Sequence, residues 1–251
     1  MKKYLSHNGN LIQRGSNKFI YRNYIPDIQP YTLRLRFREG VTPSFSKGNG
    51  VLIDSVNNIW DLTYENTDWT SLLANKSSLL EVIDGNATGV KNMYNIFYYC
   101  SRLTYVSLFN TSTVTNMECM FQDCYSLISV PLFDTSNVTT MDRMFDSCIS
   151  LEEVHGFNTS KVRNMSKMFY GCTKLTYIPM IDTSKVTNMN QMLYNCKKIQ
   201  SGALALYQQA STQTNPPSNH TNTFHNCGID TQTGAAELAQ IPTSWGGTMQ
   251  E

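Results

Sequence analysis

The chain has few charged residues, no long apolar run and no strong basic or acidic bias. Only 16% of its 251 residues are charged, and the formal net charge is +1, so the composition does not favour nucleic acid as a partner. No apolar stretch approaches the roughly 20 residues that a membrane-spanning helix needs. Lys2 and Lys3 resemble the start of a secretory signal, but no apolar segment follows them. We therefore expect no membrane span and no export by that route.

The sequence also lacks the usual signatures of catalysis and of metal binding. Its seven cysteines include no C-x-x-C pair, and there is no glycine-rich phosphate loop or nucleophile elbow. The histidines are scattered and suit packing or surface roles. The carboxylates recur with a repeat, which suits capping of turns better than an acid/base pair. These residues are His7, His155, His220 and His225, and Asp134, Asp142, Asp146 and Asp182. We expect no enzymatic activity, no metal and no cofactor.

A repeat of 24 residues dominates the chain. Its clearest mark is a column of cysteines, Cys100, Cys124, Cys148, Cys172 and Cys196, and periodicity of this length indicates a solenoid. Within a unit, Met117, Met120, Phe121 and Cys124 fall at i, i+3, i+4 and i+7, the stripe of an amphipathic helix.

A short strand is expected to follow the stripe, with Val130 and Leu132 inward and Phe133 outward. The sequence thus predicts an α/β solenoid, a stack of one short helix and one short parallel strand per unit. The cysteines would be buried thiols of its core. Cys119, which lies off the stripe, would be partly exposed.

The repeated residues carry a family resemblance. The pattern MF-x-x-C-x-x-L…FDTS-x-VT-x-M, over about residues 66 to 200, resembles the repeat of BspA-type leucine-rich-repeat surface proteins of bacteria. The flanking segments YTLRLRFREGVTPSF, NIWDLTYENTDW, SGALALYQQAS and GAAELAQIPTSWGG are similar to segments that accompany such repeats in phage and prophage proteins of gut Bacteroidales. The resemblance implies a leucine-rich-repeat-like fold and a virion setting.

The two ends of the chain differ from the repeats. Residues 1–62 are predicted to form a small β-rich attachment region, with a hairpin around Asn8 and Gly9. Residues 63–200 would be the repeats, and residues 201–251 a helical cap. The cap would hold a helix begun by Ser201, a last degenerate repeat around Phe224 and Cys227, and a short helix that stops at Pro242.

Two surfaces are candidates for binding. The outward side of the strand column would present Tyr105, Ser129, Pro131, Glu153, His155, Tyr177 and Pro179, as an extended face of the kind that repeat stacks use. An alternative left open is that Phe109, Phe133, Phe157 and Ile181 turn inward instead. The second candidate is the basic face of one strand, Arg34, Arg36 and Arg38, which would either dock an acidic protein surface or protect an edge strand.

These features predict a non-enzymatic binding and structural protein of a phage particle, assembled in the host cytoplasm. Its N-terminal region would contact other virion proteins, and its repeats would contact a bacterial or mucosal surface protein or glycan. Three alternatives stay open: a bacterial cell-surface adhesin, a glycan-acting enzyme with the repeats as substrate platform, and a purely structural decoration. A homo-oligomer is allowed but not required.

Overall fold

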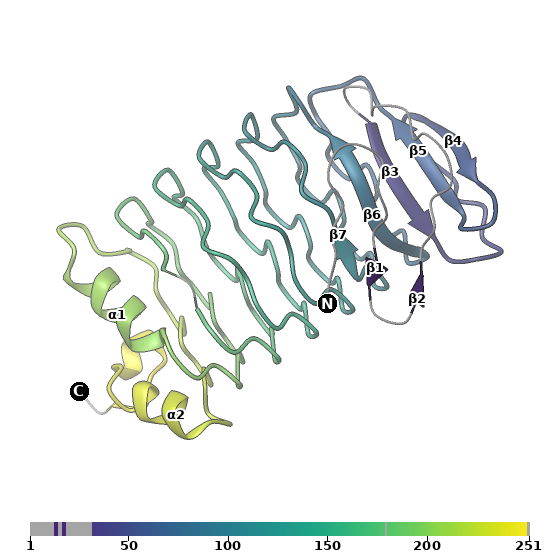
Figure 1. The fold of residues 1–251 in the computed structure, drawn as a ribbon. Coiled ribbons are helices and arrows are strands. Elements are labelled where there is room, and N and C mark those ends of the chain that lie inside the picture. Colours follow the sequence, from purple (N-terminus) through teal and green to yellow (C-terminus); the bar gives the residue numbers. More distant parts are fainter. Residues whose placement is uncertain (1–12, 15–16, 19–31, 179, 250–251) are drawn as a thin grey trace.

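The computed structural model describes residues 13–14, 17–18, 32–178 and 180–249. Its elements are, in chain order, β1 (Gln13–Arg14), β2 (Asn17–Lys18), β3 (Thr32–Phe37), β4 (Asn49–Asp54), β5 (Ile59–Thr63), β6 (Leu79–Asn86), β7 (Tyr105–Val106), α1 (Ala203–Thr212), α2 (Gln232–Leu238) and the 3₁₀ turn η1 (Thr243–Trp245). Figure 1 shows β3 to β7 at one end, the helices at the other, and rows of similar chain turns between them. The predicted hairpin around Asn8 and Gly9 lies outside the described residues.

The main sheet joins the N-terminal region to the repeats. Its five strands have the order β4-β5-β3-β6-β7. In β3, Leu35 lies opposite Trp60 of β5 on one side and Val82 of β6 on the other, both in antiparallel register. β6 then pairs with β7 in parallel, with Val82 opposite Val106. Since these two residues are 24 apart, the sheet continues directly into the repeat spacing.

The predicted α/β solenoid of helix-plus-strand units is wrong. The described sheet is open and mixed, and both described helices, α1 and α2, lie beyond the cysteine repeats. The predicted helix stripe is instead a series of β-turns. Cys119 and Asp123 have φ angles of 54° and 61°, whereas every residue of an α-helix needs φ near −60°. Apolar residues spaced at i, i+3, i+4 and i+7 therefore share one side of the chain here without a helix.

Backbone hydrogen bonds explain why turns replace the helix. Within the segment, the N–H groups of Met120 and Cys124 donate to the carbonyls three residues earlier. The alternate N–H groups donate to the next unit instead, as from Cys119 to Asp142 O at 2.8 Å and from Phe121 to Met144 O at 2.9 Å. A helix would use all of these donors internally. In this chain, stacking of one unit on the next satisfies half of them.

An asparagine-rich column marks the start of these turns and ties the units together. Parallel bridges connect Asp68, Asn92, Asn116, Thr140, Asn164, Asn188 and Asn219 in succession. The side chain of Asn116 accepts the backbone N–H of Glu118 at 2.9 Å, which is the local bond that makes asparagine favourable in turns. Asn219 follows Asn188 by 31 residues, so the last unit keeps its place in the stack despite its extra seven residues.

The repeated apolar residues form one continuous core, as the sequence predicts. The rings of Phe97, Phe121, Phe145 and Phe169 stack with centroids 5.3, 5.6 and 5.5 Å apart. Each thiol of the cysteine column donates to a carbonyl of the preceding unit, for example Cys148 Sγ to Phe121 O at 3.1 Å. The methionines beside them are fully buried. Cys119 is also buried, so the prediction of a partly exposed thiol is wrong.

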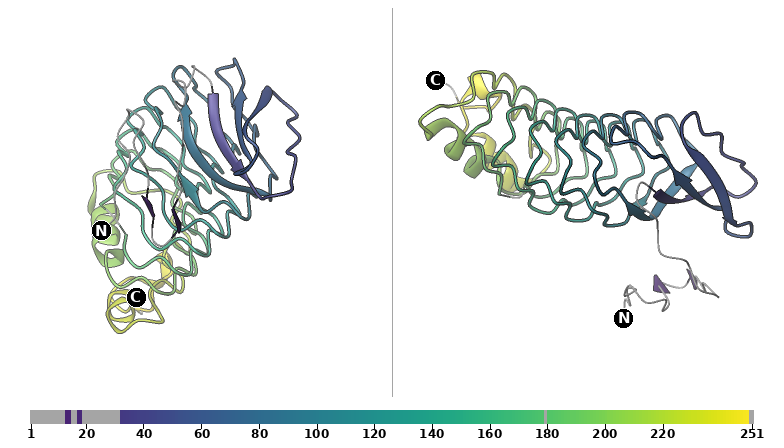
Figure 2. Two further views of the ribbon diagram at one scale, coloured as in Figure 1. Left: turned by 45° about the vertical axis from the view of Figure 1, so that its right-hand side comes forward. Right: turned by 90° about the horizontal axis from the view of Figure 1, so that it is seen from above.

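The C-terminal end contains the two predicted helices. α1 begins at Ala203, just after Gly202, and α2 ends at Leu238, four residues before Pro242. Glu237 of α2 connects them, because its carboxylate accepts the backbone N–H of Leu204 at 3.1 Å and that of Gly202 at 3.4 Å. These donors have no partner inside α1, and the helix N-terminus favours negative charge. Figure 2 shows this end of the molecule from two further sides.

Candidate binding surface

The predicted strand column forms one side of the repeat stack. Glu81 pairs with Tyr105, Ser129 with Glu153, and Tyr177 with Ser201, each across 24 residues in parallel register. Tyr105, Glu153 and Tyr177 are exposed, and Ser129 is partly buried. These four predicted residues therefore occupy equivalent positions of successive units, and isolated bridges join part of the column that they form.

The alternation predicted after Val130 is wrong. Phe133 is only 2% exposed, whereas Leu132 is 55% exposed. The backbone N–H of Phe133 donates to Pro131 O at 3.0 Å, which closes a three-residue turn and breaks the period-2 alternation of a strand. The open alternative is confirmed, because Phe109, Phe133, Phe157 and Ile181 are all buried. Phe133 packs in the core, where its ring centroid lies 6.3 Å from that of Phe121.

The loss of alternation in these units leaves a second exposed column that sequence reasoning missed. Leu108, Leu132, Gly156 and Met180 occupy equivalent positions at 24-residue spacing, and Leu108, Leu132 and Met180 are exposed, Met180 by 76%. They lie three residues after Tyr105, Ser129, Glu153 and Tyr177. We call the two columns together the repeat face. The sequence signal that could have revealed the second column is the 24-residue spacing of Leu108, Leu132 and Met180.

Charged residues gather at one part of the repeat face. A shallow depression is lined by Glu152, Glu153, Lys174, Thr176 and Lys198. Two carboxylates and two ammonium groups offer hydrogen bonds of both kinds to a polar partner. Of the other predicted residues, His155 is exposed nearby, Pro131 is partly buried, and Pro179 lies outside the described residues.

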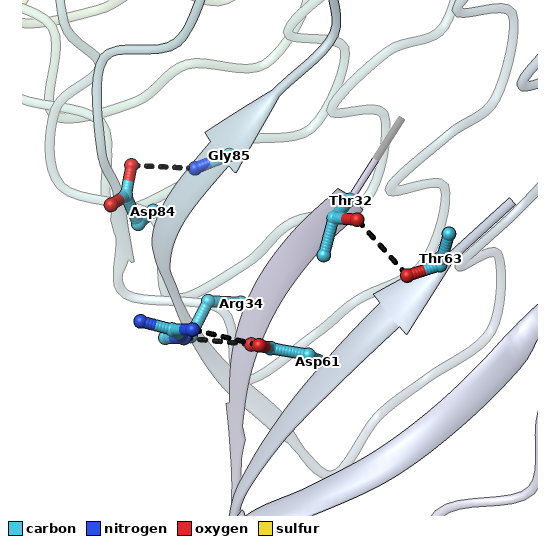
Figure 3. A network of polar contacts seen from close by, with 6 residues as sticks. All are labelled: Thr32, Arg34, Asp61, Thr63, Asp84 and Gly85. Atoms are coloured by element: carbon cyan, nitrogen blue, oxygen red, sulfur yellow. Dashed lines mark hydrogen bonds and ion pairs between the residues drawn. The ribbon is translucent and has the colours of Figure 1, made fainter. Parts of the chain in front are cut away.

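The predicted basic face of β3 is largely engaged within the sheet. Figure 3 shows Arg34 paired with Asp61 of β5 through two bonds of 2.7 Å, from Nε to Oδ1 and from Nη2 to Oδ2. Arg34 is only 3% exposed. Arg36 forms an ion pair with Glu81 of β6, and Arg38 is exposed beyond the strand. β3 is central in the sheet, so the alternative of a protective edge strand is wrong.

The cysteine column has the environment of a structural core. Burial raises the pKa of all seven thiols, and those of Cys100 and Cys196 rise to about 12. The thiolate is the form that binds metals and attacks disulfides, so these cysteines are held in their unreactive form. In the ranges that the structure describes, no group of three or more His, Cys, Asp or Glu residues could hold a metal ion.

The recurring carboxylates divide into two kinds. Asp134 and Asp182 accept the backbone N–H of Ser136 at 3.0 Å and of Ser184 at 2.8 Å, which confirms the predicted capping role. Hydrogen bonds from the Ser136 side chain and backbone lower the pKa of Asp134, and those from the Ser184 backbone and side chain lower that of Asp182. Asp142 and Asp146 are buried. They lie on the side of the stack that is formed by the β-turns of residues 117–124 and their equivalents, which we call the turn side; the opposite side, with the strand column, is the strand side. Burial raises the pKa of both carboxyls.

Two predicted histidines have packing roles. His225 stacks on Tyr194 with centroids 4.7 Å apart, and His220 stacks on Trp245 at 4.0 Å. Nδ1 of His220 also lies 3.0 Å from Pro217 O. Both rings therefore belong to the packing of the last unit, as the sequence indicates.

The fold and this surface define a protein of stacked 24-residue repeats, with one exposed face whose residues differ from unit to unit. The family model described as "Mycoplasma protein of unknown function, DUF285" matches residues 67–148 and 91–207. The two matches together cover more than half of the chain, which therefore belongs to this family. The match confirms a BspA-related repeat protein. No curated protein matches the chain. No helical segment of the described residues combines the length and the apolar character needed to cross a bilayer.

Proposed function

We propose that this protein is a non-enzymatic, adhesin-like binding protein whose repeat face contacts a protein or glycan of a bacterial or mucosal surface. Membership of a surface-repeat family supports this role. The observation that carries it is the second exposed column, where Leu108, Leu132 and Met180 expose apolar side chains in register. Apolar side chains repeated on one face need an explanation, and a contact site supplies it.

The composition of the repeat face suits recognition. Tyr105 and Tyr177 provide aromatic side chains with a polar tip, the type most enriched at binding hot spots. The charged depression around Glu153 and Lys174 lies in the same face. Backbone bonds between successive units, such as that from Glu152 N to Ile128 O at 3.0 Å, hold the backbone beneath these side chains, so little backbone entropy is lost on binding.

The test is binding of the labelled chain to intact bacterial cells and to mucin-coated plates. The variant carrying Tyr177→Ala and Met180→Ala removes two exposed side chains three residues apart. We expect it to weaken binding by about tenfold or more, which corresponds to the loss of one hot spot. Ile149→Ala is the matched control, because Ile149 is an exposed aliphatic residue outside the repeat face. Absence of binding to both surfaces, or equal loss in the control, would refute the proposal.

The setting of this protein is a separate part of the proposal. Similarity of the flanking segments to phage and prophage proteins supports a virion appendage, with the N-terminal region attached to other virion proteins. Of the predicted docking residues, Arg38 is the exposed one. Mass spectrometry of purified particles and of cell-surface fractions tests this setting. Enrichment on cells alone would favour the bacterial adhesin, and release of sugars from incubated glycans would favour the enzyme instead.

A further inference from the structure

The edge strand β4 of the main sheet exposes several aliphatic side chains. The sheet order ends at β4, which pairs with β5 on one side, and no other strand of the described residues pairs with its outer side. Val51, Leu52 and Ile53 are consecutive and all exposed, Val51 by 57%, and Val56 just beyond the strand is 83% exposed. An edge strand has backbone N–H and C=O groups that can pair with another strand.

β4 has little of the protection that edge strands usually carry. Its sequence, NGVLID, contains no lysine, arginine or proline, the residues that most often prevent edge pairing. Its one charged residue, Asp54, is bound within the following turn, where its carboxylate accepts the backbone N–H groups of Val56 and Asn57 and the Asn57 side-chain amide. A bulge at Ile53 is the single protective device.

Aromatic packing also fixes the position of β4 on the sheet. Gly50 leaves room for the Phe45 ring, because a Cβ at this position would lie within van der Waals overlap of that ring. Phe45 in turn packs against Phe37 and Trp60, with centroids 5.9 and 6.1 Å away. The aromatic residues thus fix β4 on the sheet while its outer edge stays exposed.

We propose that β4 is a dimerisation edge, at which β4 of a second copy of this chain adds antiparallel to form one continuous sheet across two molecules. With the two-fold axis at Leu52, that residue faces its own equivalent, and Val51 lies opposite Ile53 of the second copy, the residue at which β4 is bulged. The facing residues are then aliphatic on both sides, so no like charges lie opposite each other. Two-fold interfaces of this self-complementary kind are the commonest in soluble oligomers. The net charge of +1 adds almost no repulsion between copies.

Sedimentation velocity of the full chain over a wide concentration range tests the dimer. We expect a monomer–dimer equilibrium that Leu52→Lys shifts toward monomer, with a dissociation constant raised by about tenfold or more, because two lysines would meet at the axis. Leu132→Lys is the matched control on the repeat face and leaves the equilibrium unchanged. A monomer at every concentration, or an equal shift in both variants, would overturn the proposal.

Cross-linking locates the edge independently of solubility. Leu52→Cys places a thiol opposite its own equivalent, whereas the seven native thiols are buried. Mild oxidation with copper–phenanthroline yields a covalent dimer of this variant, and Leu132→Cys stays monomeric. Failure of Leu52→Cys to cross-link, or equal cross-linking of Leu132→Cys, would contradict the edge. Circular dichroism melting curves confirm that each variant is folded.

Discussion

The turn side and the strand side of the repeats differ in how much their residues vary from unit to unit. On the turn side, Phe121, Phe145 and Phe169 occupy equivalent positions, and so do Cys124, Cys148 and Cys172. On the strand side, equivalent positions hold Tyr105, Ser129, Glu153 and Tyr177. The turn side has alternate N–H groups bonded to the next unit and rings stacked in register. Positions that must match their neighbours are uniform, and positions that face solvent differ.

This difference indicates that the turn side contributes most of the stability and that the strand side is available for recognition. A stacked ring or a thiol that donates to the preceding unit is part of two units at once, so its replacement affects both. An exposed residue of the repeat face contacts few neighbours and can vary without loss of the fold. The comparison therefore orders the expected effects of change, from the turn side to the strand side.

Alkaline pH should give the largest effect, because it acts on every buried thiol of the turn side. An unfolded cysteine has a pKa of about 8.5, and burial raises all seven folded values, to about 12 for Cys100 and Cys196. Above pH 8.5 the folded chain then binds more protons than the unfolded chain, so stability falls as pH rises. Each thiol contributes a slope of about 1.4 kcal/mol per pH unit. We expect cooperative unfolding well before pH 12, measured by circular dichroism.

The control for this prediction is a chain with one fewer titrating thiol. Cys227→Ala should reduce the slope of unfolding free energy against pH by about one thiol's share. A chain that stays folded at pH 12, or a slope that the substitution leaves unchanged, would show that the thiols do not govern alkaline stability.

Removal of one stacked ring should give the next largest effect. The Phe145 ring lies between those of Phe121 and Phe169 and is fully buried. We expect Phe145→Ala to lower the free energy of unfolding by about 3–5 kcal/mol, since a cavity opens in the column. Urea denaturation measures this loss. Phe145→Leu fills most of the same space and should cost clearly less; equal losses would argue against a packing origin.

The sequence predicts the core of this fold better than its local conformation. Met117, Phe121 and Cys124 are correctly placed inside, because their spacing identifies a common face whatever the backbone does. Their predicted helix is wrong because the φ angles of Cys119 and Asp123 are set by hydrogen bonds to the next unit, which no pattern within one unit encodes. Both C-terminal helices are predicted, but Ser201 does not cap the first one: its N-cap is Gly202, and the carboxylate of Glu237 from α2 accepts the N–H groups at its start.

The candidate site shows the same limit. The positions of Tyr105, Glu153 and Tyr177 on an exposed column follow from the register alone. The exchange of Leu132 and Phe133 does not follow from it, because the buried Phe109, Phe133, Phe157 and Ile181 break the period-2 alternation of a strand in four successive units. Likewise, alternation in β3 identifies Arg34 and Arg36 on one face, but their partners Asp61 and Glu81 come from strands far away in the sequence.

A thiol-to-carbonyl bond should give a smaller effect than a ring. Cys148 Sγ donates to Phe121 O at 3.1 Å, and Cys148→Ala leaves that buried carbonyl without this donor. The N–H of Cys124 still donates to Phe121 O, so we expect a loss of about 0.5–1.5 kcal/mol in the free energy of unfolding. Cys148→Ser keeps a hydroxyl donor and should lose less than the alanine variant in the same urea titration. A serine variant that is the less stable of the two would show that apolar packing, and not the hydrogen bond, is the role of the thiol.

The smallest change in the free energy of unfolding is expected on the strand side. Two adjacent residues, one exposed and one buried, test it. Leu132→Ala should change the free energy of unfolding by less than about 0.5 kcal/mol, since the side chain is exposed. Phe133→Ala, one residue later, should cost about 3–5 kcal/mol because its ring packs in the core. Urea denaturation of both variants measures the difference. If Leu132→Ala also weakens binding to cells or mucin, the Leu132 side chain contributes to contact with a partner and not to stability. Equal losses of stability in the two variants would instead place Leu132 in the core and remove it from the repeat face.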